Sequence, residues 1–123
     1  MAESDPDATM DQPAGTYTEA DLERVVARDF PQESIPAVRD LLSRYGQEGE
    51  WQREILRVQM ACLKCADGDL KELERAVATA CLDYRDVLGP AEYPTYYKAR
   101  TDEAKQKAIE KDWKQLQAWL NRK

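Results

Sequence analysis

Two neighbouring runs within residues 50–88 repeat apolar residues at steps of three and four, and no other feature of the chain constrains its fold as strongly. Such steps line one face of an α-helix. Because only Asp67-Gly68-Asp69 separates the runs, the two helices must return antiparallel to each other. The sequence therefore predicts a long helical hairpin, with helices at about 50–66 and 69–88. Its apolar positions are Trp51, Ile55, Val58, Cys62 and Cys65, then Leu70, Leu73, Val77, Ala80, Tyr84 and Val87.

Two shorter helices are expected before the hairpin. Thr18 can serve as a helix N-cap, and Asp21 three residues later completes a variant of the capping box. This helix should end before Pro31. A second helix should begin with Ser34 as its cap, and Gly46 should stop it, since glycine readily adopts the left-handed conformation that ends helices.

After the hairpin, Gly89-Pro90 is expected to end the helix, because proline lacks the amide that continues the hydrogen-bond ladder. Thr101 then caps a last helix at about 102–121. This helix should dock on the hairpin through Trp113 and its neighbours. Its apolar stripe consists of Ile109, Trp113, Leu116 and Leu120, with Trp119 beside it.

These elements predict an all-α fold, a five-helix bundle built on the hairpin with the C-terminal helix packed across it. The two short helices should cover the remaining open side. A chain of 123 residues is expected to form one domain, which we place at 17–123. Residues 1–16 are rich in Ser, Asp, Pro, Ala, Gly and Thr, and we expect them to be a disordered acidic tail.

The net charge of −6 is concentrated at the N-terminus. Residues 1–21 contain six acidic residues and no basic one, whereas residues 98–123 contain eight basic and four acidic residues. The acidic residues interleave with the lysines, which indicates a solvated helix face rather than a nucleic-acid surface. No apolar run approaches the about 20 residues of a membrane span, and no secretory signal begins the chain. We expect a cytoplasmic protein that binds neither nucleic acid nor membrane.

Motifs for nucleophilic, redox or zinc chemistry are scarce. The chain has no histidine, which removes the commonest general base and its nucleophile pairs. Cys62 and Cys65 form a CxxC pair, but near a helix end whose dipole would raise the thiol pKa. Cys81 should lie roughly 10 Å from Cys62 along the hairpin axis, too far to share a zinc ion. We therefore expect three free thiols, no metal and no cofactor.

A carboxylate site is the alternative chemical hypothesis. Asp83 and Asp86 flank Tyr84 and Arg85, and Glu92 follows shortly. Paired carboxylates can carry out acid–base catalysis or hold a metal ion. More commonly, such residues form ion pairs on an exposed face.

The best candidate binding site is a tyrosine cluster in a segment bracketed by prolines. Tyr93, Tyr96 and Tyr97 lie in or beside the segment bounded by Pro90 and Pro94, with Arg85 and Arg100 near its two ends. Tyrosine gives a large contact area at low entropic cost and is enriched in protein interfaces. The competing interpretation is that these rings roof the open end of the hairpin, with their hydroxyl groups in water.

Three stretches resemble small bacterial all-helical proteins of unknown function. They are Ala61-Cys62-Leu63-Lys64-Cys65-Ala66-Asp67-Gly68-Asp69-Leu70, Asp83-Tyr84-Arg85-Asp86-Val87-Leu88 and Glu92-Tyr93-Pro94. The resemblance covers about residues 38–120. It implies a bacterial, cytosolic protein, and it implies no activity and no functional residue.

Together these features favour a small regulatory or protein-binding module without catalytic activity, whose partner is an unidentified protein. An enzyme built on Asp83, Asp86 and Glu92 is the second hypothesis. The third is a homodimer or larger homo-oligomer, because Trp113 and Trp119 lie six residues apart on a helix that can pair across a two-fold axis.

Overall fold

The computed structural model describes residues 17–47, 49 and 54–122. The expected acidic tail at 1–16 and Trp51 of the predicted seam lie outside these residues. The described part holds α-helices and two short 3₁₀-helices and no β-strand. The elements are α2 (Glu19–Asp29), η2 (Gln32–Ser34), α3 (Ile35–Ser43), α4 (Ile55–Ala66), α5 (Leu70–Leu82), α6 (Arg85–Glu92), η3 (Tyr96–Lys98) and α7 (Asp102–Leu120).

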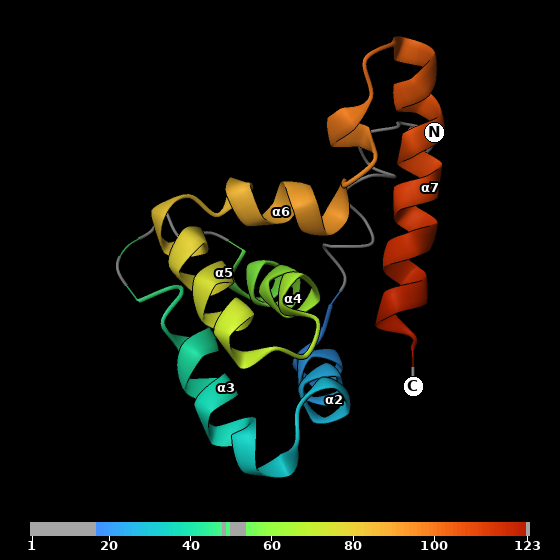
Figure 1. The fold of residues 1–123 in the computed structure, drawn as a ribbon. Helices are drawn as coiled ribbons and strands as arrows, with labels where there is room; N and C mark the ends of the chain where they lie inside the picture. The colour runs from blue at the N-terminus through green and yellow to red at the C-terminus, as the bar shows by residue number, and fades with distance from the viewer. Residues whose placement is uncertain (1–16, 48, 50–53, 123) are drawn as a thin grey trace.

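Helices α4 and α5 pack together as the predicted hairpin at the centre of the fold (Figure 1). In the turn between them, Asp67 and Gly68 both have positive φ, at 47° and 82°. Asp69 then accepts hydrogen bonds from the amides of Lys71 and Glu72, which caps the start of α5. The buried seam includes Val58, Cys62, Leu63, Leu73, Val77 and Ala80.

The second helix of the hairpin is shorter than predicted, because α5 ends at Leu82. At Asp83 the backbone is extended, with φ −158° and ψ 108°. The Asp83 carboxylate accepts a hydrogen bond from the backbone amide of Arg85 at 3.0 Å. A short acidic side chain thus competes with the helical hydrogen bonds, ends α5 and precedes a new helix.

The prediction that Gly89-Pro90 ends a helix is wrong, since both residues lie inside α6. A proline inside a helix loses one amide donor and its ring crowds the carbonyl four residues earlier, but its fixed φ is compatible with helical backbone. The last turn closes because the Tyr93 amide donates to the Gly89 carbonyl at 2.8 Å. Helix α6 packs against α4 and α5 and buries Val87 and Leu88, so tertiary packing outweighs local propensity here.

The two short helices cover another side of the hairpin, as predicted. Helix α2 packs on α4, and α3 packs on α5 (Figure 1). The capping box of Thr18 and Asp21 is confirmed by reciprocal hydrogen bonds of 3.0 and 3.1 Å. Ser34 precedes α3, but its side chain makes no capping hydrogen bond, since the 3₁₀ turn η2 leads directly into the helix.

Helix α7 packs chiefly on η3 and α6, and one of its ends projects beyond α6 (Figure 1). The prediction that the C-terminal helix docks through Trp113 is wrong, because Trp113 is 41% exposed whereas Trp119 is only 7% exposed. The buried face is turned away from the predicted stripe because it is built around the carboxylate of Asp112. This face consists of Ala108, Asp112, Leu116 and Trp119.

The described residues confirm the all-α class but not the predicted helix count. The expected helix at 69–88 is in fact two helices, α5 and α6, with the break at Asp83. None of the helices in the described ranges combines the length and apolar character that crossing a bilayer requires.

Candidate functional site

The predicted tyrosine cluster follows α6 and leads into η3. The rings of Tyr93 and Tyr96 meet edge to face, with centroids 6.3 Å apart and an interplanar angle of 62°. This is a favourable arrangement for an aromatic pair. Both residues are half-buried. These two tyrosines are therefore partly covered by the fold and by each other.

Tyr97 differs from its neighbours, because 75% of its surface is exposed. Its ring lies beside Gly89 of α6, where a methyl group would come within 3.5 Å of Tyr97 Cε1. Arg85 is one helical turn before Gly89 and shares its face of α6. Tyr97, the half-buried Gly89 and the exposed Arg85 therefore lie along one side of α6, and we call these three residues the tyrosine surface.

Arg85 is held in place at the start of this surface. Its side chain donates to both oxygens of the Asp83 carboxylate, at 3.0 and 2.9 Å. These hydrogen bonds lower the pKa of the Asp83 carboxyl group below its usual value. The Arg85 side chain remains 76% exposed, so the ion pair contributes little to folding and leaves part of the guanidinium open to solvent.

The tyrosine surface rests on a buried carboxylate from α7. Asp112 is 1% exposed and accepts hydrogen bonds from two backbone amides at the start of η3. The Thr95 amide lies 3.1 Å from each carboxylate oxygen, and the Tyr96 amide lies 2.8 Å from Oδ2. These bonds attach η3 to α7 directly before Tyr97, and thereby fix the backbone that presents its ring.

A second buried carboxylate, Glu92, lies directly before Tyr93. Glu92, the last residue of α6, is paired with Arg57 of α4 through contacts of 2.7 and 2.9 Å. Burial is the largest single influence on Arg57 and disfavours its charge, but the hydrogen bonds and charges of Glu92 and Glu54 together outweigh burial and raise the guanidinium pKa. Arg57 also donates to Glu54 at 3.0 Å. Residues 93–97, which we call the tyrosine segment, are therefore fixed by charge-assisted bonds of Glu92, directly before the segment, and of the Thr95 and Tyr96 amides within it.

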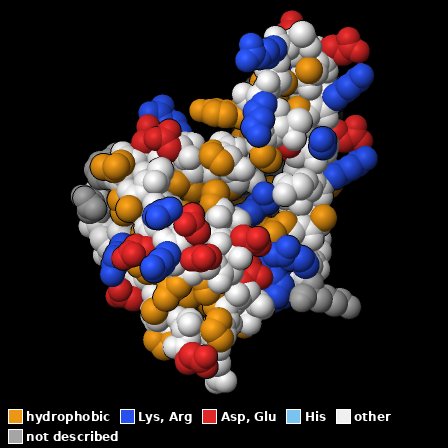
Figure 2. Space-filling view, viewed as in Figure 1, with side chains coloured by type: hydrophobic (Ala, Val, Ile, Leu, Met, Phe, Trp, Pro, Cys, Tyr) orange, Lys and Arg blue, Asp and Glu red, His pale blue; other side chains and the backbone are white. Residues whose placement is uncertain are grey.

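The C-terminal part of the chain adds positive charge next to this surface. Residues 95–122, which we call the basic arm, contain seven basic and four acidic residues. Two of its lysines pair with glutamates one turn away, Lys107 with Glu103 and Lys114 with Glu110. Figure 2 shows Lys and Arg side chains gathered on the projecting end of the molecule. Arg100, the last predicted site residue, is exposed in the link between η3 and α7.

The alternative carboxylate site is not assembled. Glu92 is buried against Arg57, whereas Asp83 binds Arg85 and Asp86 is exposed. Within the described ranges, no group of three Cys, Asp or Glu side chains is placed to hold a metal ion. Glu92 and Asp83 therefore bind different arginines rather than forming one centre.

Cys62 and Cys65 of the CxxC pair lie in different environments. Cys62 is buried in the hairpin seam, and burial raises the pKa of its thiol. Cys65 was predicted on the buried stripe, but it is exposed and its sulfur lies 3.9 Å from the Val87 carbonyl oxygen. Burial of the thiol group nevertheless raises its pKa. Raised pKa values lower the thiolate fraction, so the CxxC spacing does not create a reactive pair.

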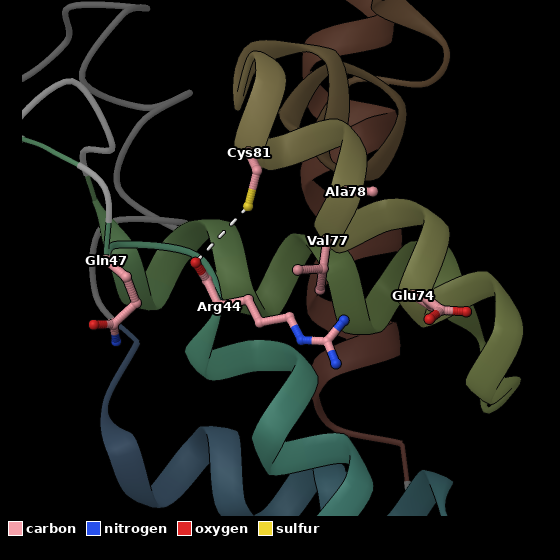
Figure 3. A pocket seen from close by; sticks show the side chains of 6 residues that line it. All are labelled: Arg44, Gln47, Glu74, Val77, Ala78 and Cys81. Carbon is pink, nitrogen blue, oxygen red and sulfur yellow. Dashed lines mark hydrogen bonds between the residues drawn. The ribbon is translucent and has the colours of Figure 1, made fainter.

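A hollow between α3 and α5 lies apart from the tyrosine surface (Figure 3). Val77, Ala78 and Cys81 give it an apolar wall, and the Arg44 side chain extends along it in the direction of Glu74. The Cys81 thiol lies 3.8 Å from the Arg44 carbonyl oxygen. The hollow is open to solvent.

Comparisons with protein-family models, curated proteins and solved structures return no match for this chain. A function for this chain therefore has to be inferred from its own residues.

Sequence reasoning missed the two groups that fix the site, Asp112 and the Arg57–Glu92 pair. A signal for Asp112 was present, because it lies four residues after Ala108 and four before Leu116 on one helical face. A single acid within an apolar stripe indicates a buried acceptor with a specific donor. Glu92 had no comparable signal, since its partner lies 35 residues away in the chain.

Proposed function

We propose that this protein is a small protein-binding module without catalytic activity, and that its contact surface is the tyrosine surface with the adjoining basic arm. The observation that carries the proposal is the exposed ring of Tyr97 on a firmly anchored backbone. A large aromatic side chain on a backbone that is already ordered before binding loses little conformational entropy when a partner binds. Single exposed apolar side chains are common on monomeric folds, so the anchored backbone beneath Tyr97, rather than its exposure alone, supports the proposal.

A protein suits this surface better than a nucleic acid does. Positive charges on the arm alternate with carboxylates, including Glu103 and Glu110. Carboxylates at this spacing would repel the closely spaced phosphates of a nucleic acid, whereas a protein partner can meet both signs. The partner we propose is a protein with acidic and apolar groups at its contact face.

Affinity capture from a lysate of the source organism tests this proposal, with wild type compared with Tyr97→Ala. Tyr97 is exposed, so its truncation should change stability by no more than about 0.5 kcal/mol. Tyr93 and Tyr96 are half-buried, so they are kept unchanged. Leu82→Ala is the matched control, since Leu82 is 86% exposed at the end of α5, outside the proposed surface.

A protein retained by wild type and by Leu82→Ala but lost from Tyr97→Ala supports the proposal. Equal retention by all three proteins contradicts the location of the surface. If wild type retains nothing, the binding hypothesis loses its support, and thermal melts with divalent ions and metabolites test the enzyme hypothesis instead.

Self-association is a second candidate, favoured by one observation on α7. Trp113 is 41% exposed, and Ile109 and Leu120 on the same side of the helix are half-buried. Two copies that paired these sides would cover the indole. Sedimentation at two concentrations distinguishes the candidates: dimerisation that Trp113→Ala abolishes supports self-association, and a monomer at both concentrations contradicts it.

A further inference from the structure

The first described residue, Tyr17, lies near the start of the basic arm. Tyr17 packs against the hydrophobic core, and its hydroxyl group lies in the electrostatic environment of Glu92, Arg57 and Tyr93. Burial, followed by the Glu92 charge, raises the pKa of this hydroxyl group. Residues 1–16 therefore join the fold next to Tyr93, the residue that leads from α6 into the tyrosine segment.

Four bases of the arm form no ion pair within the described part of the chain. They are Lys98, Arg100, Lys105 and Lys111, and each is exposed or half-exposed. By contrast, the described residues before the arm, 17–47, 49 and 54–94, contain nine basic and fourteen acidic residues. The arm is therefore the positive region of an otherwise acidic molecule, and an acidic segment is its complementary ligand.

Residues 1–16 have that composition. They contain Glu3, Asp5, Asp7 and Asp11 and no lysine or arginine. Sixteen residues span at most about 50 Å when extended, and a helix of 19 residues such as α7 is about 28 Å long. The segment is therefore long enough to reach the whole arm from Tyr17. Covalent linkage gives it a millimolar effective concentration.

We propose that residues 1–16 bind the unpaired bases of the basic arm within the same molecule, and that they compete there with an acidic segment of a protein partner. This deepens the proposed function, on which its second half rests, by naming the class of partner and a regulator of its access. The attraction is electrostatic between exposed groups, so it weakens as ionic strength rises.

The intramolecular contact is tested on the full chain by paramagnetic relaxation. A nitroxide is attached at position 8 through Ala8→Cys, in a background with Cys65→Ser and Cys81→Ser; Cys62 is buried and stays. The amide signals of the arm at Lys98, Arg100, Lys105 and Lys111 should lose intensity near 0.01 M salt. They should recover near 1 M salt, where the Debye length falls to about 3 Å.

Two charge variants make this result specific. The tail variant carries Glu3→Gln, Asp5→Asn, Asp7→Asn and Asp11→Asn, and it should restore the arm signals at low salt. The control variant carries Glu33→Gln and Glu74→Gln, two acids outside the arm, and it should leave the broadening in place. Broadening confined to α2, or unchanged in the tail variant, overturns the proposal.

Competition is tested separately by the capture experiment. The tail variant should retain more partner than wild type, because the arm is no longer occupied; equal retention overturns the competition. The relaxation measurement needs no partner, so an empty capture refutes the proposed function without affecting the intramolecular contact. Absence of broadening refutes the contact and leaves the Tyr97 result untouched.

Discussion

The carboxylate of Asp112 accepts a hydrogen bond of 2.8 Å from the backbone amide of Tyr96, and this bond joins α7 to the segment that presents Tyr97. Helix α7 packs chiefly on η3 and α6, so its position depends on a polar contact as much as on apolar burial. The buried acid is satisfied because it has two amide donors and three contacts.

Asp112→Ala should therefore lower the free energy of unfolding by about 2–3 kcal/mol, because it leaves buried amide donors without an acceptor. Hydrogen exchange at the Thr95 and Tyr96 amides should accelerate. Glu110→Ala is the control, since Glu110 lies two residues earlier and is exposed. Urea denaturation measures both variants, and equal small effects would show that the carboxylate does not hold η3.

The Arg57–Glu92 pair should show a large asymmetry between its two carboxylates. The Glu92 side chain is 3% exposed, whereas that of Glu54, which binds the same guanidinium, is 46% exposed. Glu92→Ala leaves the largely buried Arg57 guanidinium with the exposed Glu54 as its remaining partner and should cost about 3 kcal/mol, the lower end of the range for a broken buried pair. Glu54→Ala should cost less than about 1 kcal/mol. Similar costs in chemical denaturation would refute the anchoring role of Glu92.

The hairpin α4–α5 was predictable because its evidence is local. A repeat of three and four residues and a short Asp-Gly turn determine two helices and their antiparallel return. The end of α5 was not predictable from periodicity, since Tyr84 and Val87 continue the apolar steps beyond it. The decisive interaction is the carboxylate of Asp83 on the amide of Arg85, which the hydrophobic pattern does not register.

The candidate site was predictable in composition but not in geometry. Proline and tyrosine content located the segment, yet exposure separates Tyr97 from Tyr93 and Tyr96, and this separation depends on contacts with α6 and α7. The docked face of α7 was also mispredicted, because apolar stripes identify aliphatic and aromatic contacts only. A buried carboxylate such as Asp112 shifts the face by one position.

Arg28 connects the end of α2 to the end of α7, and its removal should loosen both. Its guanidinium donates to the carbonyl oxygens of Trp119 at 2.8 Å and Arg122 at 2.9 Å, and lies 5.1 Å from the centre of the Trp119 ring. A cation at a helix C-terminus also complements the dipole. Arg28→Met should destabilise the fold by about 2–4 kcal/mol, because it removes these hydrogen bonds and leaves the buried Asp29 carboxylate with only the Arg122 guanidinium, at 4.0 Å.

The matched control is Arg24→Met, one turn earlier on α2. Arg24 is 44% exposed and lies 3.9 Å from its partner Asp21, so its loss should change stability by no more than about 0.5 kcal/mol. Nuclear magnetic resonance adds a local measurement, since the Trp119 indole signal should move in Arg28→Met and remain in place in Arg24→Met. A large loss of stability in both variants would indicate a general charge effect.

Stability should fall at alkaline pH, in part through Tyr45. This residue is 2% exposed, and burial raises its pKa from 10.0 to about 12. A raised pKa in the folded state means that the neutral hydroxyl is favoured there, so the contribution is fully present below pH 10 and is lost as the pH rises from 10 towards 12. The free energy of unfolding then falls by about 1.4 kcal/mol per pH unit for one such group.

Tyr45→Phe lacks this titration, so urea denaturation between pH 8 and 11 should show the wild type losing stability relative to the variant above pH 10. Tyr17 and Cys62 also have raised pKa values, but they are common to both proteins and cancel in the difference. Parallel stability curves would contradict the burial of the Tyr45 hydroxyl group.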